Sequence, residues 1–262
     1  MSSTYISLSP SILEEFRLLI SGAYERMGKG SDDFVRYIMS EYQPNIYTSR
    51  GNAYGDVLEK GLGIGAWVYS RKAIAEMQEE FYEFEEQQKE WRDHAPDLIR
   101  PDLLRVHEKS LNKNWYFTSK ELAPAIALRQ QYPQMIYEKW GGFSLKILDQ
   151  PVYISLRADG LNGNQIHEFK TSTKPKSRKD RIDSLQRKCY HACWPDSEVL
   201  IYHEFQFKGP KEDPFVKYRS HEFQNYKEAK QEVEHFAHEL LQWMEYHPEC
   251  VEKRTRVSKK NG

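Results

Sequence analysis

The spacing of apolar residues predicts helices at both ends of the chain. Residues 9–27 carry apolar side chains at helical intervals, namely Ile12, Leu13, Phe16, Leu19 and Ile20. The same spacing predicts a short helix at 32–39, a helix from 50 to about 91 that is interrupted by glycines, and a final helix at 227–246. A helix with one apolar face needs another element to cover that face, so these helices are expected to pack on a common core.

After residue 142 the pattern changes to the alternation that is typical of strands. Three strands are predicted at 143–148, 151–161 and 164–172. Tight turns are predicted at Asp149-Gln150 and Asn162-Gly163. The segments that follow are predicted as helix, strand and strand, at 183–194, 198–207 and 215–223. This order predicts an α/β fold in which a mixed central sheet is flanked by helices.

The chain is predicted to form a single domain, residues 1–262, with an insertion. Its parts are N-terminal helices (9–70), a charged helical insertion (about 71–140), a core (about 141–208), a C-terminal strand and helix (214–247) and a basic tail (253–262). Within the insertion, Thr118 and Glu121 form a capping-box pattern that opens a helix. The insertion either covers the sheet as a plain helical layer or gates an entrance, contacts a partner or guides a strand.

Composition favours a protein of the cytoplasm. No apolar run is long enough to cross a bilayer, and the first ten residues lack a signal-peptide pattern. The three cysteines are an odd number, which favours reduced thiols. Cys189 and Cys193 are spaced to share a metal on a helix, but no second pair of ligands is evident for a closed site.

Charge is distributed unevenly although the net charge is only −1. Residues 79–90 are strongly acidic, whereas residues 170–181 and the tail at 253–260 are strongly basic. Two solvated faces and a frayed end would explain this pattern. The functional alternative is one face that repels a polyanion and another that receives it.

The stretch DGLNGNQIHEFKTS, residues 159–172, places ionisable groups on predicted strands. Asn-Gly favours a two-residue type I′ loop, and a loop at Asn162-Gly163 sets Asp159 opposite Ile166. Because side chains alternate along a strand, one face then carries three ionisable groups: Asp159, Glu168 and Lys170. Asp159 and Glu168 become diagonal neighbours with Cβ atoms about 7 Å apart.

Two carboxylates at that separation are suited to holding one divalent cation. Such a cation polarises a phosphodiester and acidifies water, and Lys170 is placed to orient that water or to offset developing charge. The backbone carbonyl of Phe169 is a further candidate ligand. The alternative is a surface ladder of salt bridges, but the apolar residues on these strands favour burial.

These residues resemble the PD-(D/E)XK phosphodiesterases, and within them the RecB-like and lambda-exonuclease-like nucleases. The family carries an Asp at the end of one strand and acid-x-Lys on the next, matched by Asp159, Glu168 and Lys170. It also carries Gln-x-x-x-Tyr on the following helix, matched by Gln186 and Tyr190. The opening helix SPSILEEF and the segment RGNAYGDVLEKG are similar to the family's N-terminal helices. The resemblance covers residues 140–208 well and residues 5–70 loosely, and it implies a restriction-endonuclease-like core.

Two departures from the family pattern affect the metal ligands. Gly55 stands where many RecB-like members have a metal-binding His. The resemblance therefore points to Glu59 as the metal ligand from this helix, with Asp56 in reserve. The cysteines are too few and wrongly placed for the iron–sulfur cluster of some relatives, so no cluster is expected.

The basic segment 170–181 is expected to grip a DNA backbone by charge alone. Its candidate phosphate contacts are Lys174, Lys176, Arg178, Lys179 and Arg181. A disordered loop is the alternative reading of this segment.

The resemblance implies an exonuclease, dependent on Mg²⁺ or Mn²⁺, that resects DNA ends in recombination, repair or phage replication. It further implies double-stranded ends or single strands of DNA as substrate, in the cytoplasm of a bacterial or phage-infected cell, with no membrane partner. Lambda-like relatives pair with a single-strand annealing protein and form ring-shaped homo-oligomers. A restriction-type endonuclease and a non-catalytic nucleic-acid-binding protein on the same fold remain open as alternatives.

Overall fold

The computed structural model of this chain describes residues 4–40, 45–68, 103–173, 177–210 and 213–257. Its helices are α1 (Pro10–Ile20), α2 (Ala23–Arg26), α3 (Ser31–Met39), α4 (Ile46–Lys60), the 3₁₀ turn η1 (Leu62–Ile64), α7 (Ser119–Gln131), α8 (Arg178–Ile182), α9 (Leu185–Cys193), α10 (Ala229–Met244) and α11 (Pro248–Arg254). Its strands are β1 (Thr4–Leu8), β2 (Ala66–Val68), β3 (Leu103–Glu108), β4 (Lys113–Phe117), β5 (Ile136–Ile147), β6 (Gln150–Asn162), β7 (Gln165–Ser172), β8 (Val199–Lys208), β9 (Phe215–Gln224) and β10 (Thr255–Val257).

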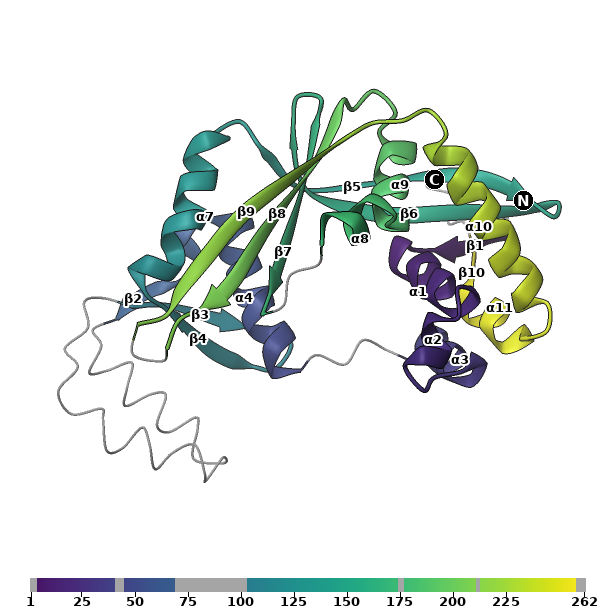
Figure 1. The fold of residues 1–262 in the computed structure, drawn as a ribbon, viewed down its shortest axis with the longest axis horizontal. Coiled ribbons are helices and arrows are strands. Elements are labelled where there is room, and N and C mark those ends of the chain that lie inside the picture. Colours follow the sequence, from purple (N-terminus) through teal and green to yellow (C-terminus); the bar gives the residue numbers. More distant parts are fainter. Residues whose placement is uncertain (1–3, 41–44, 69–102, 174–176, 211–212, 258–262) are drawn as a thin grey trace.

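Seven of the described strands form one mixed sheet in the order β10-β1-β6-β7-β8-β9, with β5 also paired to β6. The β1–β6 and β7–β8 pairs are parallel, whereas the other pairs are antiparallel. A second, three-stranded sheet has the order β2-β3-β4. Helices lie on both sides of the large sheet (Figure 1). The predicted α/β class, with a mixed central sheet flanked by helices, is therefore confirmed.

The large sheet forks along one edge of β6. Strand β5 pairs with β6 along nearly its whole length. The opposite edge of β6 pairs with β1 at residues 152–154 and with β7 only at residues 160–162. Between these contacts, within the described part of the chain, this edge has no strand beside it. The backbone groups that face the opening need other partners, because unpaired buried N–H and C=O groups are costly.

The two hairpin loops lie one residue away from their predicted positions. Asn162 pairs with Gln165, so the loop is Gly163-Asn164 rather than Asn162-Gly163. Of these two, only Gly163 has a positive φ, 56°, which is the pattern of a type II′ turn with glycine first, not of type I′. The other loop is Leu148-Asp149, with φ 49° and 59°, rather than Asp149-Gln150. Both φ values are positive there, as a type I′ turn requires.

Two large hydrophobic clusters of described residues pack against the large sheet, one on each side. The first packs α1, α3, α9 and α10 against the sheet through residues that include Phe16, Phe34, Leu185 and Leu240. The second joins α4, α7 and β4 to the sheet through residues that include Tyr54, Leu122, Phe117 and Phe205. Because α4 and α9 belong to different clusters, they reach the fork of the sheet from opposite sides (Figure 1).

The predicted helical insertion at 71–140 is wrong over much of its described part. Residues 103–108, 113–117 and 136–140 are strands, and only Ser119–Gln131 is helical. In β3 the residues are mostly buried and pair on both edges, so tertiary pairing decides their structure. The capping box at Thr118 is present and opens α7 as expected. Residues 71–102 lie outside the described residues, and the division into parts stays a prediction.

The helix predicted from residue 50 is interrupted at Gly61, as expected from its glycines: Gly61 adopts φ 83°, and the turn η1 and strand β2 follow. Its predicted continuation from 69 to about 91 lies outside the described residues. The described part of the basic tail is ordered: β10 pairs with β1. Among the described helices, none has the length and apolar character needed to span a bilayer.

Candidate functional site

The predicted site residues gather where the sheet forks. The side chain of Asp159 accepts a hydrogen bond from the backbone N–H of Phe169, at 2.6 Å. The hydroxyl of Tyr190 lies 2.9 Å from the backbone carbonyl of Arg157 and shares its single proton between this carbonyl and Glu168. These side chains therefore satisfy backbone groups beside the open part of the strand ladder. If β6 and β7 were paired along this stretch, their backbone groups would bond to each other and would not need these side chains. The open stretch between the strands and the side-chain contacts therefore occur together.

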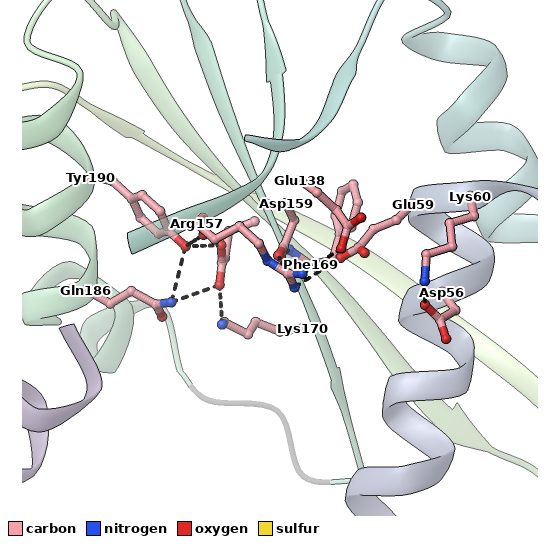
Figure 2. Close-up of polar contacts among 11 residues, drawn as sticks. Asp56, Glu59, Lys60, Glu138, Arg157, Asp159, Phe169, Lys170, Gln186 and Tyr190 are labelled. Atoms are coloured by element: carbon pink, nitrogen blue, oxygen red, sulfur yellow. Dashed lines mark hydrogen bonds and ion pairs between the residues drawn. The ribbon is translucent and has the colours of Figure 1, made fainter. Parts of the chain in front are cut away.

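Glu168 on β7 is the centre of a hydrogen-bonded group, and its three partners Lys170, Gln186 and Tyr190 are labelled in Figure 2. Its side chain is 3% exposed. It accepts from the amide of Gln186 at 2.9 Å and from the ammonium of Lys170 and the hydroxyl of Tyr190. Three donors on one carboxylate fix its orientation.

Helix α9 supplies two of these donors from one face. Gln186 and Tyr190 are four residues apart and lie on one face of the helix, and both side chains contact Glu168. Leu185 and Cys189 are fully buried in the core and fix the rotation of the helix. At the start of α9, the N–H of Leu185 donates to the carboxylate of Glu14, at 2.8 Å. The helix is thereby anchored at its first turn as well as along its buried face.

On the other side of the fork, Arg157 stands among three carboxylates (Figure 2). Its guanidinium lies 2.6 Å from Glu138, 3.5 Å from Glu59 and 3.8 Å from Asp159. Glu59 comes from α4, as predicted for the helical metal ligand. The reserve ligand Asp56 instead pairs with Lys60 on the same helix and lies outside this group.

Glu138 is a site residue that the sequence analysis missed. Its neighbours on β5 pair with Gly160 and Ala158, so the register sets Glu138 opposite Asp159 on β6. Continued by one pair, the β6–β7 register sets Asp159 opposite Glu168. Three neighbouring strands thus bring one carboxylate each to the same level of the sheet. Glu138 also has φ 52°, a conformation that is uncommon for residues other than glycine and is concentrated at functional sites.

The electrostatics of the site favour a bound cation. Burial, reinforced by the neighbouring Glu168, raises the pKa of Asp159 well above its ordinary value, against the opposing effect of Lys170. Burial also raises the pKa of Glu59 to about 7, although the guanidinium of Arg157 opposes this. Raised carboxyl pKa values mean that negative charge here is not fully compensated, and a cation would relieve this cost.

The carboxylate oxygens of this site suit a hard divalent ion, but the distances between them at present suit a guanidinium. Carboxylate oxygens are the ligands that Mg²⁺ and Mn²⁺ prefer. Among the described residues, no three His, Cys, Asp or Glu side chains stand close enough together to hold a metal ion. Arg157 occupies the space between three of the acids as a stand-in cation. Cys189 and Cys193 are free thiols, and Cys189 is buried in the core.

The predicted DNA-contacting residues are only partly on the surface. Arg178 and Lys179 are exposed on α8. The prediction that Arg181 contacts phosphate is wrong. Its side chain is buried, with the residue 8% exposed, and pairs with Glu204 at 2.8 Å. Glu204 is a buried carboxylate in the middle of β8, and a buried charge needs a partner of opposite sign, so it draws Arg181 inward. Lys174 and Lys176 lie outside the described residues.

Comparison with known proteins leaves the family open. No protein-family model matches the chain, and no match was found among curated proteins. A solved structure of a candidate exonuclease from Eubacterium rectale is similar over 98% of this chain and 84% of its own, with 11% identity and a TM-score of 0.43. The structure of SSO0001 is similar over 47% of this chain, with 16% identity and a TM-score of 0.37, and the match spans 56% of that protein. The site's own side chains therefore have to indicate the function.

Proposed function

We propose that this protein is a metal-dependent phosphodiesterase that hydrolyses DNA, and that the fork of the sheet is its active site. The observation that carries this proposal is the convergence on Glu168 of Lys170, Gln186 and Tyr190, with Asp159 beside it. A mere surface ladder of salt bridges would leave Glu168 exposed, whereas it is almost completely buried. A buried carboxylate with three donors is characteristic of an organised site.

Glu59, Asp159, Glu168 and the backbone carbonyl of Phe169 would hold Mg²⁺ or Mn²⁺. When bound, such an ion supplies Lewis-acid polarisation of the phosphodiester and a water of lowered pKa. Lys170 is placed beside Glu168 to orient the attacking water or to stabilise charge on the phosphate. Gln186 and Tyr190 hold Glu168 in one orientation, the task of residues that surround a metal ligand.

The arrangement supports assignment to the PD-(D/E)XK nucleases, in their RecB-like or lambda-exonuclease-like branch. The acid of one strand, the acid-x-Lys of the next and the Gln-x-x-x-Tyr helix meet at one place, as that resemblance requires. We further propose exonuclease action on DNA ends in recombination, repair or phage DNA processing. A single-strand annealing protein as partner and a homo-oligomeric ring belong to the same proposal.

Phosphate contacts are assigned to the surface around the start of α8. Arg178 and Lys179 are exposed there and directly follow the segment that contains Lys174 and Lys176. Contacts made by charge alone release counterions, so DNA binding is expected to weaken steeply as salt increases.

The test is digestion of a linear duplex labelled at its 5′ or 3′ end, beside a closed circle, with Mg²⁺ or Mn²⁺. The wild type is compared with Lys170→Ala and with Lys120→Ala, which removes an exposed lysine on α7. We expect the wild type to degrade only the linear DNA, and Lys170→Ala to lower the rate by about 10² or more. Lys120→Ala should leave the rate unchanged.

Each other outcome points to a different reading. Cutting of the circle would indicate a restriction-type endonuclease with the same core. Binding of DNA without cleavage under either metal would indicate a non-catalytic nucleic-acid-binding protein. Equal rates for Lys170→Ala and the wild type would contradict the proposed active site.

A further inference from the structure

Arg157 is more exposed to solvent than two of the three acids that surround it. The side chains of Glu59 and Asp159 are 9% and 13% exposed, whereas those of Arg157 and Glu138 are 38% and 41% exposed. Of its contacts with the three acids, the one with Glu138, at 2.6 Å, is a hydrogen bond, whereas those with Glu59 and Asp159 are longer, at 3.5 and 3.8 Å. The guanidinium therefore stands at the mouth of the group, above the two buried acids.

One positive charge faces three carboxylates in this group. An exposed ion pair such as Arg157–Glu138 contributes little to holding a side chain in place, because water and salt screen it. A guanidinium is also wider than a metal ion, so acids arranged around it stand farther apart than the ligands of an ion do. Among the described residues, no three acidic, His or Cys side chains are close enough together to hold a metal ion. A divalent ion would carry twice the charge in a smaller volume.

We propose that Arg157 is a resident counter-cation whose guanidinium occupies the place of a divalent ion, so that the two exclude each other. When the ion binds, Arg157 turns to solvent, and Glu138 joins Glu59 and Asp159 as a ligand. The exposure of Arg157 leaves it a path outward that needs no movement of the core. This inference rests on the proposed metal-dependent function and adds to it a competing residue and a further ligand.

The first measurement is calorimetric titration of chelator-treated protein with Mn²⁺. It compares the wild type with Arg157→Gln, with Arg157→Gln/Glu138→Gln and with Lys60→Ala. Lys60 lies next to Glu59 in the chain but pairs with Asp56, so its removal matches the loss of one nearby positive charge without opening the site.

We expect Arg157→Gln to bind Mn²⁺ at least about tenfold more tightly than the wild type, since a competing charge has been removed. Adding Glu138→Gln should weaken that binding by about tenfold, because one carboxylate ligand is lost. Lys60→Ala should stay within about twofold of the wild type, since exposed charges are screened. Circular dichroism confirms that each variant is folded.

A second measurement restores the missing group chemically. Millimolar guanidinium chloride should weaken Mn²⁺ binding to Arg157→Gln toward the wild-type affinity, whereas sodium chloride at equal ionic strength should not. If Arg157→Gln fails to fold, Arg157→Lys replaces it. The compact ammonium of lysine cannot bridge three carboxylates as a guanidinium does. Mn²⁺ is therefore again expected to bind severalfold more tightly than to the wild type.

The outcomes separate this inference from the function on which it rests. If the wild type binds Mn²⁺ and the Arg157 variants bind it equally or more weakly, Arg157 does not compete, and the proposed function survives alone. If guanidinium has no more effect than sodium, competition for that place is likewise refuted. If neither the wild type nor the variants bind Mn²⁺, both proposals fail together.

Discussion

A buried pair of histidines makes the fold sensitive to mild acid. His167 on β7 and His203 on β8 share a hydrogen bond of 2.8 Å, and His203 bonds through its other ring nitrogen to the hydroxyl of Tyr218. Both imidazoles are almost completely buried. Burial lowers the pKa of His167 to about 4 and that of His203, with a further contribution from His167, to about 3.

The direction of the pH effect follows from these lowered values. Both imidazoles stay neutral in the native protein near pH 6, whereas the unfolded chain takes up protons below the ordinary pKa of 6.5. The free energy of unfolding therefore falls as the pH decreases through 6.5. At pH 5.5, one unit below that value, each histidine costs about 1.4 kcal/mol relative to high pH.

The test measures urea unfolding at pH 7.5 and pH 5.5, in chelator, for the wild type and His203→Gln. The variant should lose stability at both pH values because hydrogen bonds are lost. The difference between its two free energies should be smaller than that of the wild type by about 1.4 kcal/mol. Glu59, whose raised pKa works in the opposite direction, is present in both proteins and cancels. His235→Gln, an exposed histidine on α10, is the control.

The reasoning is refuted if His203→Gln keeps the full pH dependence of the wild type. That result would mean that the pair takes up protons in the native state as easily as in the unfolded chain. A slope reduced equally by His235→Gln would also count against it.

Three further changes have defined expected results. Glu204→Gln leaves Arg181 buried without its carboxylate and should lower the free energy of unfolding by about 3–5 kcal/mol in urea titrations. Tyr190→Phe removes the hydroxyl that bonds to Glu168 and to the carbonyl of Arg157 and should lower the DNA cleavage rate about 10- to 100-fold, with a retained cooperative thermal transition as evidence that the variant is folded. Gly142→Ala would place a Cβ 2.6 Å from the carbonyl oxygen of Ile154, and this overpacking should cost about 1–3 kcal/mol by thermal unfolding; no loss would show that β5 can shift.

The parts of the fold that local patterns specify were predictable. Strands β6 to β9, the second half of β5, and helices α9 and α10 follow from alternation or helical spacing. The helix α7 follows from its capping box. The short strands β1, β2 and β10 have only three to five residues, and their pairing partners lie far away in the chain. Tertiary contacts decide such segments, so no local signal identifies them.

The site was predictable to the extent that its residues lie within a recognisable pattern. Asp159, Glu168, Lys170, Gln186 and Tyr190 were named together and lie together. The β6–β7 register differs from the predicted one, but both partners move by one residue, so Asp159 and Glu168 remain neighbours. Glu138 lies on a strand without a motif, and only the pairing of β5 with β6 brings it to the site.

The position of β1 between β6 and β10 sets an order on folding during synthesis. This strand comes before the other described strands in the sequence, yet its partners are residues 152–154 on one edge and 255–257 on the other. Its backbone N–H and C=O groups must stay hydrated until those distant segments have been made, and closing such long loops is slow. We therefore expect protection of the β1 amides from hydrogen exchange to appear late in refolding. Of the described strands, the first in sequence order is therefore expected to complete its pairing last.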